Sequence, residues 1–493
     1  MTALTFNCSL ITDPTELALC NYVVESATPL SCNGSLPYTS GGACFNYDSA
    51  VAKSAALLGD DGTMDTGNNA FMLMSTALVF IMTPGVGIFY AGLAGEESVS
   101  NTLMMSFSTI CVVTVQWFLF GYSFAFGPGT SGFGSFQWGA MWDVGGAPSG
   151  VYGFGIPHLT YAVFQLMFAI ITPALISGAV IGRMKFTTFL LFTFIWTTCI
   201  YDTLAHWLWS FTIDPDTGAI INLGWLGSDG ALDFAGGSVI HISSGFAALA
   251  CAMVLGKRHN YGEPVKPHNN PLVMLGGSLV WMGWFGFNAG SAGGAANVGG
   301  VQYDASGNLL VANGLASTAF INSHLAASAG AFTWMVMDKI VLKTVTPAGV
   351  ACGGIAGLVA ITPGAGFVDV WASIMFGIIV VPFCYFGGKI KVLLGADDTL
   401  DSFSLHGIGG AVGAFLTGCF ATENINFANG AFYGYSLRLA WNCADIAVAG
   451  SFSFTGTLLL MMILKRTVGI RIPEEAEKEG IDKSEHGGSS YIH

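Results

Sequence analysis

Charged residues are scarce in this chain. Asp, Glu, Lys and Arg make up only 9% of its 493 residues, whereas an ordinary soluble domain has about 25%. So few charges cannot cover the surface of a soluble fold of this size. With 53% hydrophobic residues and a mean hydropathy of +0.62, the composition predicts an all-α polytopic membrane protein.

Other signals are missing as well. The formal net charge is −14, and nucleic-acid binding needs a basic face, so no nucleic-acid partner is expected. No Cys or His cluster has the spacing of a ligand set, so neither a metal site nor a cofactor is expected. No nucleophile–base pair appears at matched depth, which argues against an enzyme. No basic segment precedes an early apolar run, so no cleavable signal peptide is expected.

Eleven apolar stretches are long enough to cross a bilayer. They lie at residues 70–94, 101–126, 158–181, 187–211, 234–256, 271–291, 311–338, 346–362, 367–388, 402–421 and 434–465. The chain therefore divides into a polar segment at 1–68, a transmembrane domain at 69–465 surrounded by membrane lipids, and a tail at 466–493.

The basic residues predict the orientation of these stretches. If the N-terminus is outside, fourteen of the sixteen Lys and Arg residues fall inside, and only Lys53 and Arg438 fall outside. This positive-inside pattern predicts an N-out, C-in topology with an odd number of spans. The outer loops carry acidic residues instead, which either concentrate an approaching cation or simply keep the loops solvated.

The polar N-terminal segment has features of an extracellular one. Its four cysteines, expected to form disulfides outside the cell, are Cys8, Cys20, Cys32 and Cys44. The chain's only two Asn-x-Ser/Thr sequons begin at Asn7 and Asn33. Both fall in this segment, which favours N-glycosylation and a eukaryotic plasma membrane.

Two histidines lie in the middle of apolar stretches. At helical spacing, His241 shares a face with small residues such as Gly237 and Gly245, and His406 shares one with Gly409. Such faces let helices approach closely. An ionisable group deep in lipid is costly and usually faces a protein interior or a pathway, so we expect these two histidines to come together.

Two other histidines are interpreted as structural. His206 lies near the end of a stretch, and His324 has no matching motif around it.

Short matches suggest an internal repeat. Phe89-Tyr-Ala-Gly in the first stretch is similar to Phe287-Asn-Ala-Gly in the sixth, and the fifth and tenth each carry a histidine preceded by an aspartate. Five spans plus five would form a pseudo-two-fold inverted repeat with the functional site at the midplane between the halves.

Several longer motifs carry a family resemblance. They are Phe164-Gln-Leu-Met-Phe168, Ala205-His-Trp-Leu-Trp209, Asp233-Phe-Ala-Gly-Gly-Ser-Val-Ile-His241, Gly283-Trp-Phe-Gly-Phe287-Asn-Ala-Gly-Ser291, Asp401 to His406, and the tail from Val468 to Gly488. Over about residues 68–490 the chain resembles the ammonium transporter, methylammonium permease and Rhesus protein superfamily, and within it the ammonium transporter branch.

The resemblance implies a homotrimer of eleven-helix subunits with one pore per subunit, and a role for each matching residue. Trp209, Ser291, Phe164 and Phe168 would form an outer recruitment site, and Phe168 and Phe287 a gate. His241 and His406 would line the pore, and Asp233 would be a structural carboxylate. Without the family resemblance, the phenylalanines would be interpreted as ordinary apolar packing residues. Trp209 would be interpreted as a residue of the membrane interface and Asp233 as a helix N-cap.

The chemistry of these residues suits ammonium, with methylammonium as an analogue. A Trp face attracts a cation, and a Ser hydroxyl accepts a hydrogen that potassium cannot donate. A dry pore would impose a large dehydration cost on any ion but not on neutral ammonia. The hypothesis is recruitment of ammonium, deprotonation, and passage of ammonia past the two histidines. Net charge movement is implied by the resemblance.

The tail resembles the family's regulatory tail, which contacts a neighbouring subunit. Ser484 falls where plant-type relatives carry a phosphorylatable Thr, so a kinase or another cytoplasmic regulator is an expected partner. The main alternative function is an ammonium sensor with little or no flux. A channel for carbon dioxide or urea fits the Trp and Ser site less well.

Overall fold

A computed structural model gives the fold of this chain. It describes residues 64–148, 152, 155–213, 220–222, 224–263, 267–295, 302–303, 309–310 and 314–491. The N-terminal cysteines Cys8, Cys20, Cys32 and Cys44 and the sequons at Asn7 and Asn33 lie outside these residues. The seven cysteines in the described part of the chain are unpaired.

Each of the eleven expected stretches coincides with a helix or with an unbroken run of helical segments. In chain order these are α3 (Thr66–Leu93); η2 (Glu96–Ser98), α4 (Val99–Gln116), η3 (Trp117–Gly121) and α5 (Tyr122–Phe126); α6 (His158–Ser177); α7 (Phe186–Trp196), η5 (Thr197–Tyr201) and α8 (Asp202–Trp209); η6 (Gly237–Ile242) and α10 (Ser243–Leu255); α11 (Asn270–Gly290); α12 (Leu315–Val341); α13 (Pro347–Ile361); α14 (Val370–Leu393); η7 (Phe403–Ile408) and α15 (Gly409–Phe420); and α16 (Ser436–Thr467).

The remaining described elements are short. They are η4 (Gly139–Met141), α9 (Trp225–Asp229), η8 (Ala431–Tyr433), the tail helices α17 (Glu474–Glu479) and α18 (Ile481–His486), and the antiparallel hairpins β1 (Phe211–Ile213) with β2 (Ile220–Asn222) and β3 (Gln302–Tyr303) with β4 (Leu309–Leu310).

Nine of the described helical runs are long and apolar enough to cross a membrane. The other two expected spans are α12 and α13. Helix α13 has only 15 residues, and α12 has 27 but carries Asn322, Ser323 and His324 in its middle. The fold is thus a helical membrane bundle, and the full count of eleven crossings stays a prediction.

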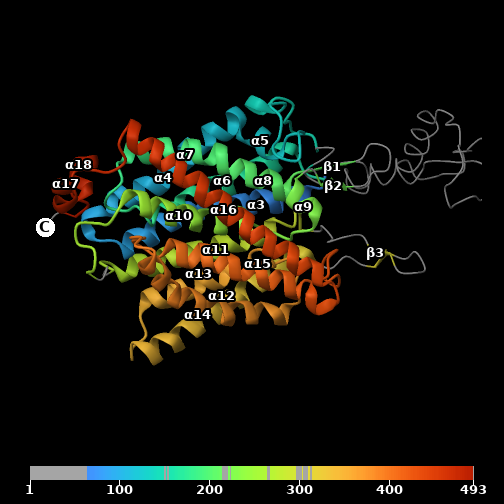
Figure 1. The fold of residues 1–493 in the computed structure, drawn as a ribbon. Helices are drawn as coiled ribbons and strands as arrows, with labels where there is room; N and C mark the ends of the chain where they lie inside the picture. The colour runs from blue at the N-terminus through green and yellow to red at the C-terminus, as the bar shows by residue number, and fades with distance from the viewer. Residues whose placement is uncertain are drawn as a thin grey trace, which may run out of the picture.

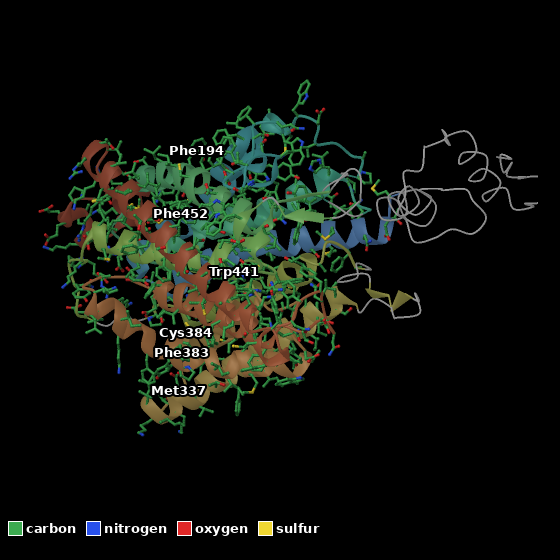
Figure 2. All side chains as sticks on the ribbon, turned by 45° about the vertical axis from the view of Figure 1, so that its right-hand side comes forward. Phe194, Met337, Phe383, Cys384, Trp441 and Phe452 are labelled. Carbon is green, nitrogen blue, oxygen red and sulfur yellow. The ribbon has the colours of Figure 1, made fainter. Side chains whose placement is uncertain are left out.

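The long helices run side by side, and the two ends of the bundle differ (Figure 1). The hairpins β1–β2 and β3–β4 lie at one end, and the tail helices α17 and α18 lie at the opposite end. Apolar side chains cover the lateral surface between them, as Phe194 on α7, Phe383 on α14 and Phe452 on α16 illustrate (Figure 2).

Glycines bring α3 and α11 into close contact. A Cβ atom at Gly276 would overlap the backbone nitrogen of Phe89, and one at Gly286 would lie 2.6 Å from the carbonyl oxygen of Ser75. The contact therefore runs antiparallel, with the start of α11 beside the end of α3. These two helices carry the similar motifs at Phe89 and Phe287, and both line the interior of the bundle.

Candidate functional site

The structure brings the two mid-span histidines together. His241 on η6 and His406 on η7 lie with their Nδ1 atoms 3.2 Å apart. Their rings are nearly parallel, with centroids 5.3 Å apart and an interplanar angle of 19°. Both side chains are buried.

This geometry constrains the protons of the pair. A hydrogen bond between two Nδ1 atoms needs one N–H donor and one lone-pair acceptor, so neutral rings must adopt opposite tautomers. One Nε2 then carries a hydrogen and the other a lone pair. The Nε2 atom of His241 has no partner in the described part of the chain. The pair can therefore both donate to and accept from a small molecule beside it.

Both histidines lie on π-helical turns, and a buried carboxylate holds the start of each turn. Asp233 accepts hydrogen bonds from four consecutive backbone amides, those of residues 236–239, at 2.6–3.1 Å. The sequence predicted Asp233 as a helix N-cap; in the structure the N-cap residue of η6 is Gly236, and Asp233, three residues earlier, supplies the carboxylate that these amides bind. Gly236, at φ +121°, makes the turn that brings these amides round the carboxylate.

The counterpart of Asp233 in the second half is Asp398. Its carboxylate accepts from the amides of Ser402 (3.2 Å) and Phe403 (2.8 Å) at the start of η7. Burial raises the pKa of Asp398 above its ordinary value, and nearby Lys391 opposes this. Asp401, the acidic residue that the sequence motif singled out, instead forms a half-exposed ion pair with Lys391 at 2.7 Å.

Small residues allow the two histidine turns to touch. A Cβ atom at Gly245 would overlap the backbone nitrogen of Gly407, and one at Gly410 would lie 2.9 Å from the carbonyl oxygen of Gly237. The glycine-rich faces expected from the sequence therefore form the contact between the two segments. The backbones meet at distances that no larger side chain allows.

Aromatic rings continue from the histidines towards the end of the bundle that carries the hairpins. Trp284 stacks on His241 with centroids 5.3 Å apart. Phe287 lies 6.1 Å from His241 and 4.4 Å from Phe168. Phe164 follows, 4.9 Å from Phe168. Phe168 and Phe287 are both fully buried, so they close the space between the histidines and the outer residues.

The outer residues lie just beyond these rings. Trp209 is 6.2 Å from Phe168, and its Nε1 donates to the carbonyl oxygen of Asp233 at 2.8 Å. The Ser291 hydroxyl donates to the carbonyl oxygen of Phe287 at 2.9 Å. Because its hydrogen is used in this way, the Ser291 oxygen is left as an acceptor.

A narrow cavity of about 10 Å³ lies beside the histidines. Such a space holds roughly one water-sized molecule. Apart from the two imidazoles and Tyr90, its lining consists of apolar residues from α3, α6, η6, α11 and α13. A hydrated ion does not fit there, whereas a single small neutral molecule does.

Two residues of this cavity were not expected from the sequence. Trp284 donates from Nε1 to the Thr362 hydroxyl at 2.9 Å, which fixes the ring stacked on His241. The hydroxyl of Tyr90 donates to the carbonyl oxygen of Leu175 at 3.1 Å. Both lie in the quoted motifs, but among so many aromatic residues nothing in the pattern distinguishes them.

The remaining predicted residues lie away from this cavity. His206 has Nδ1 3.0 Å from the carbonyl oxygen of Ala125 and Nε2 2.8 Å from that of Thr130. His324 lies on α12 against Trp281 and Phe285. Ser484 is exposed on α18.

The bundle and its site define a class of protein. Many apolar helices enclose a narrow apolar cavity, in which two phenylalanine rings in tilted contact lie beside a buried histidine pair. The class is a multi-pass membrane protein with a small buried site. The comparisons make this specific. Residues 70–491 match the family model described as Ammonium Transporter Family, and the chain belongs to that family.

Curated relatives are similar over nearly their full length. The ammonium transporter of Bacillus subtilis is 43% identical over 431 residues, which is 87% of this chain and 99% of that protein. Ammonium transporter 1 of Schizosaccharomyces pombe is 39% identical over 87% of this chain and 83% of its own length. These relatives are named as transporters, which favours a function other than catalysis.

Solved structures share the fold. Candida albicans Mep2 superposes with a TM-score of 0.74 at 34% identity, covering 84% of this chain and 87% of that one. A protein described as a sensor Amt protein gives the same TM-score at 24% identity. At that identity the likeness extends to the fold alone.

Proposed function

We propose that this chain transports ammonium by recruiting the ion at the outer end of the site and passing ammonia through the narrow cavity. The observation that carries this proposal is the buried pair His241 and His406, which lies in an apolar cavity behind the rings of Phe168 and Phe287. The arrangement offers hydrogen bonds to one small molecule and little compensation for a charge.

Recruitment is assigned to the outer residues. The Trp209 ring attracts a cation by about 0.5–2 kcal/mol, depending on how far the ion is desolvated. The Ser291 oxygen is available to accept one ammonium hydrogen. Phe164 and Phe168 complete the site. The Ser291 oxygen can coordinate potassium but cannot form a hydrogen bond with it, since potassium has no hydrogen to donate.

Passage follows once ammonium has lost its proton. Ammonia moves between Phe168 and Phe287 and then along the histidines, whose Nε2 atoms supply one donor and one acceptor. Transport carries net charge, because the proton also crosses. Asp233 has a structural role in this scheme: it holds the turn that bears His241 and, through its carbonyl oxygen, the ring of Trp209.

The assembly belongs to the same proposal. The chain crosses the plasma membrane eleven times, N-out and C-in, as a five-plus-five inverted repeat, and forms a homotrimer with one pore per subunit. Residues 1–68 are extracellular, with sequons and disulfide-forming cysteines. Residues 69–465 form the transporter domain, and 466–493 form a cytoplasmic regulatory tail. Eleven helical runs, and a tail at the end of the bundle opposite the hairpins, support this arrangement.

The first test is ammonium-evoked current in proteoliposomes. Wild-type protein is compared with the double variant His241→Ala, His406→Ala, and with His324→Ala as a matched control outside the cavity. We expect a saturable current that the double variant alters and the control retains. Equal currents in all three proteins would contradict passage along the histidine pair.

The same experiment separates transporter from sensor. If wild-type protein binds ammonium but gives no current, a pH assay in the same liposomes distinguishes two remaining functions. A pH change indicates electroneutral ammonia passage, and its absence indicates an ammonium sensor.

Regulation is proposed at Ser484. Ser484 is an exposed residue whose hydroxyl donates to the carbonyl oxygen of Ile481 at 3.2 Å. It precedes Glu485, whose carboxylate accepts from the backbone amide of Phe186 at 3.0 Å. A phosphate there would repel Glu485 and loosen the tail. We expect lower ammonium uptake from Ser484→Asp than from Ser484→Ala. Full uptake by both variants would contradict this proposal.

A further inference from the structure

A buried carboxyl group that the transport scheme does not use lies against the turn that bears His241. Asp445 on α16 is fully buried, and its Oδ2 atom is in hydrogen-bond contact with the Ser238 hydroxyl on η6. Further along α16, the Ser453 hydroxyl donates to the carbonyl oxygen of Ser243 at 2.6 Å. Helix α16 therefore supports both η6 and α10 through polar contacts in the interior of the bundle.

Asp445 has few hydrogen-bond donors around it. In the described part of the chain, the Ser238 hydroxyl is its one donor, and its Oδ1 atom has no hydrogen-bond partner. Asn442, one turn earlier on α16, uses its side-chain NH₂ group on the carbonyl oxygens of Leu232 and Ala414. An ionised carboxyl group only accepts hydrogen bonds, so Asp445 lacks the donors that a buried carboxylate needs.

No positive charge compensates Asp445 either. None of the ion pairs among the described residues includes it. The nearest Lys or Arg on its own helix is Arg438, seven positions earlier and so about 10 Å away along the helix axis. The Arg438 guanidinium lies over the Tyr435 ring and donates to the carbonyl oxygen of Gly230. Neither η6 nor the packed helices α10 and α15 contain a Lys or Arg.

A second carboxyl group is bound by the same serine. The Ser238 backbone amide donates to Asp233 Oδ2 at 2.9 Å, while the Ser238 hydroxyl contacts Asp445. The four amides that donate to Asp233 stabilise its ionised form. Two carboxyl groups that share a site cannot both ionise without repulsion. The arrangement therefore favours one negative charge, on Asp233.

We propose that Asp445 is a proton-binding site, which carries one proton and binds Ser238 as a neutral carboxylic acid. The carboxyl O–H donates to Ser238 Oγ, since the positions of the two oxygens do not fix which of them carries the hydrogen. Oδ1 is then an uncharged carbonyl oxygen, and its lack of a partner costs less than that of a charged oxygen. The proton needs no cavity, because it occupies no space beyond the carboxyl group itself.

This makes Asp445 a positioning residue for His241, which follows Ser238 by three residues on the same turn. With Asp445 neutral, the one negative charge beside the turn is that of Asp233, which four amides disperse. A second negative charge there would favour a protonated His241, in a cavity that offers little compensation for charge. This last consequence rests on the proposed passage of neutral ammonia, whereas the proton-binding site does not.

The test is infrared difference spectroscopy of the purified full chain in liposomes at neutral pH. The spectrum of Asp445→Asn is subtracted from that of wild type, and we expect the difference to contain the C=O stretch of one protonated carboxylic acid. The matched control is Asp401→Asn, which removes the half-exposed partner of Lys391 and should lose carboxylate bands instead. Loss of carboxylate bands from Asp445→Asn would overturn the proposal. The spectra report the proton whether or not the chain transports ammonium.

Two further variants guard against a folding defect in Asp445→Asn. Ser238→Ala removes the acceptor of the carboxyl O–H and should shift the acid band to higher frequency without abolishing it. Asp445→Ala removes the donor and should unfold at a lower temperature than Asp445→Asn, whose NH₂ group replaces the O–H towards Ser238. An unshifted acid band in Ser238→Ala, or equal unfolding temperatures of the two Asp445 variants, would contradict the bond from Asp445 to Ser238.

Discussion

At the scale of single residues, Asp398 and Asp401 lie three positions apart and have different structural roles. Asp398 is buried and holds the first amides of η7, the turn that bears His406. Asp401 is half exposed and pairs with Lys391. A buried carboxylate that satisfies helix amides supports the residues of that turn, whereas an exposed ion pair contributes little.

The two aspartates can be compared directly. Asp398→Asn replaces one accepting oxygen with an NH₂ group that faces backbone donors, and we expect it to lower the free energy of unfolding by about 1–3 kcal/mol. Asp401→Asn keeps a residue that tolerates φ +59° and should cost at most about 1 kcal/mol. Thermal unfolding of the two purified variants measures the difference. Equal losses would mean that Asp398 does not hold the turn.

Trp209 provides a second residue-scale prediction. Trp209→Leu removes the aromatic face beside Phe168 and should raise the half-saturating ammonium concentration by about two- to thirtyfold. Trp207→Leu is the matched control, since Trp207 packs against Trp225 and Phe452 and its Nε1 donates to Gly132. Concentration-dependent currents in proteoliposomes report both values. A similar shift from the two variants would argue against recruitment at Trp209.

At the scale of the elements, the contact between η6–α10 and η7–α15 sets the distance between the histidines. Gly245 meets Gly407 backbone to backbone, and Gly410 meets Gly237. Each turn also begins at a buried aspartate. The geometry of the histidine pair therefore depends on glycines and carboxylates that do not line the cavity beside it.

Gly245→Ala tests this contact. The added methyl group would overlap the Gly407 nitrogen, so the two segments must separate, at a cost of about 1–3 kcal/mol. We expect reduced transport together with reduced stability. Gly409→Ala is the control on the facing segment η7–α15, because its methyl group would meet Val359 at 3.2 Å, which a small side-chain shift relieves. Wild-type currents from Gly245→Ala would show that the contact tolerates separation.

The sequence predicted the positions of the helices better than their local geometry and capping. Apolar length located all the helical runs to within a few residues, and helical spacing identified the small-residue faces of His241 and His406. The spacing of apolar residues does not separate a π-helical turn from an α-helical one, so η6 and η7 were not foreseen. The sequence motif that ends at His406 begins at Asp401, whereas the aspartate that holds the start of η7 is Asp398, because capping depends on the path of the loop.

At the scale of the whole molecule, carboxylates of the tail bind backbone amides at the N-terminal ends of long helices of the bundle. Asp482 accepts from the backbone amides of Ser100 and Asn101 at the start of α4 (2.8 and 2.7 Å). Glu485 accepts from that of Phe186 at the start of α7. A helix N-terminus favours a negative charge. The sequence indicated a regulatory tail, but contacts between residues nearly four hundred positions apart cannot be inferred from local pattern.

Asp482→Ala should therefore release the tail. It removes two charge-assisted bonds to α4 and a third from the Ser490 hydroxyl at 2.6 Å. The buried amide of Asn101 then loses its acceptor, whereas that of Ser100 keeps the Ser490 hydroxyl at 3.0 Å. Because bonds to a charged group contribute about 1.5–3 kcal/mol each, we expect proteolysis at Lys483 to become much faster while the bundle resists. Glu479→Ala, which breaks only an exposed ion pair with Lys483, should cleave as wild type does. If ammonium currents change with Asp482→Ala in step with tail cleavage, docking and transport are coupled; unchanged cleavage would mean that other contacts hold the tail.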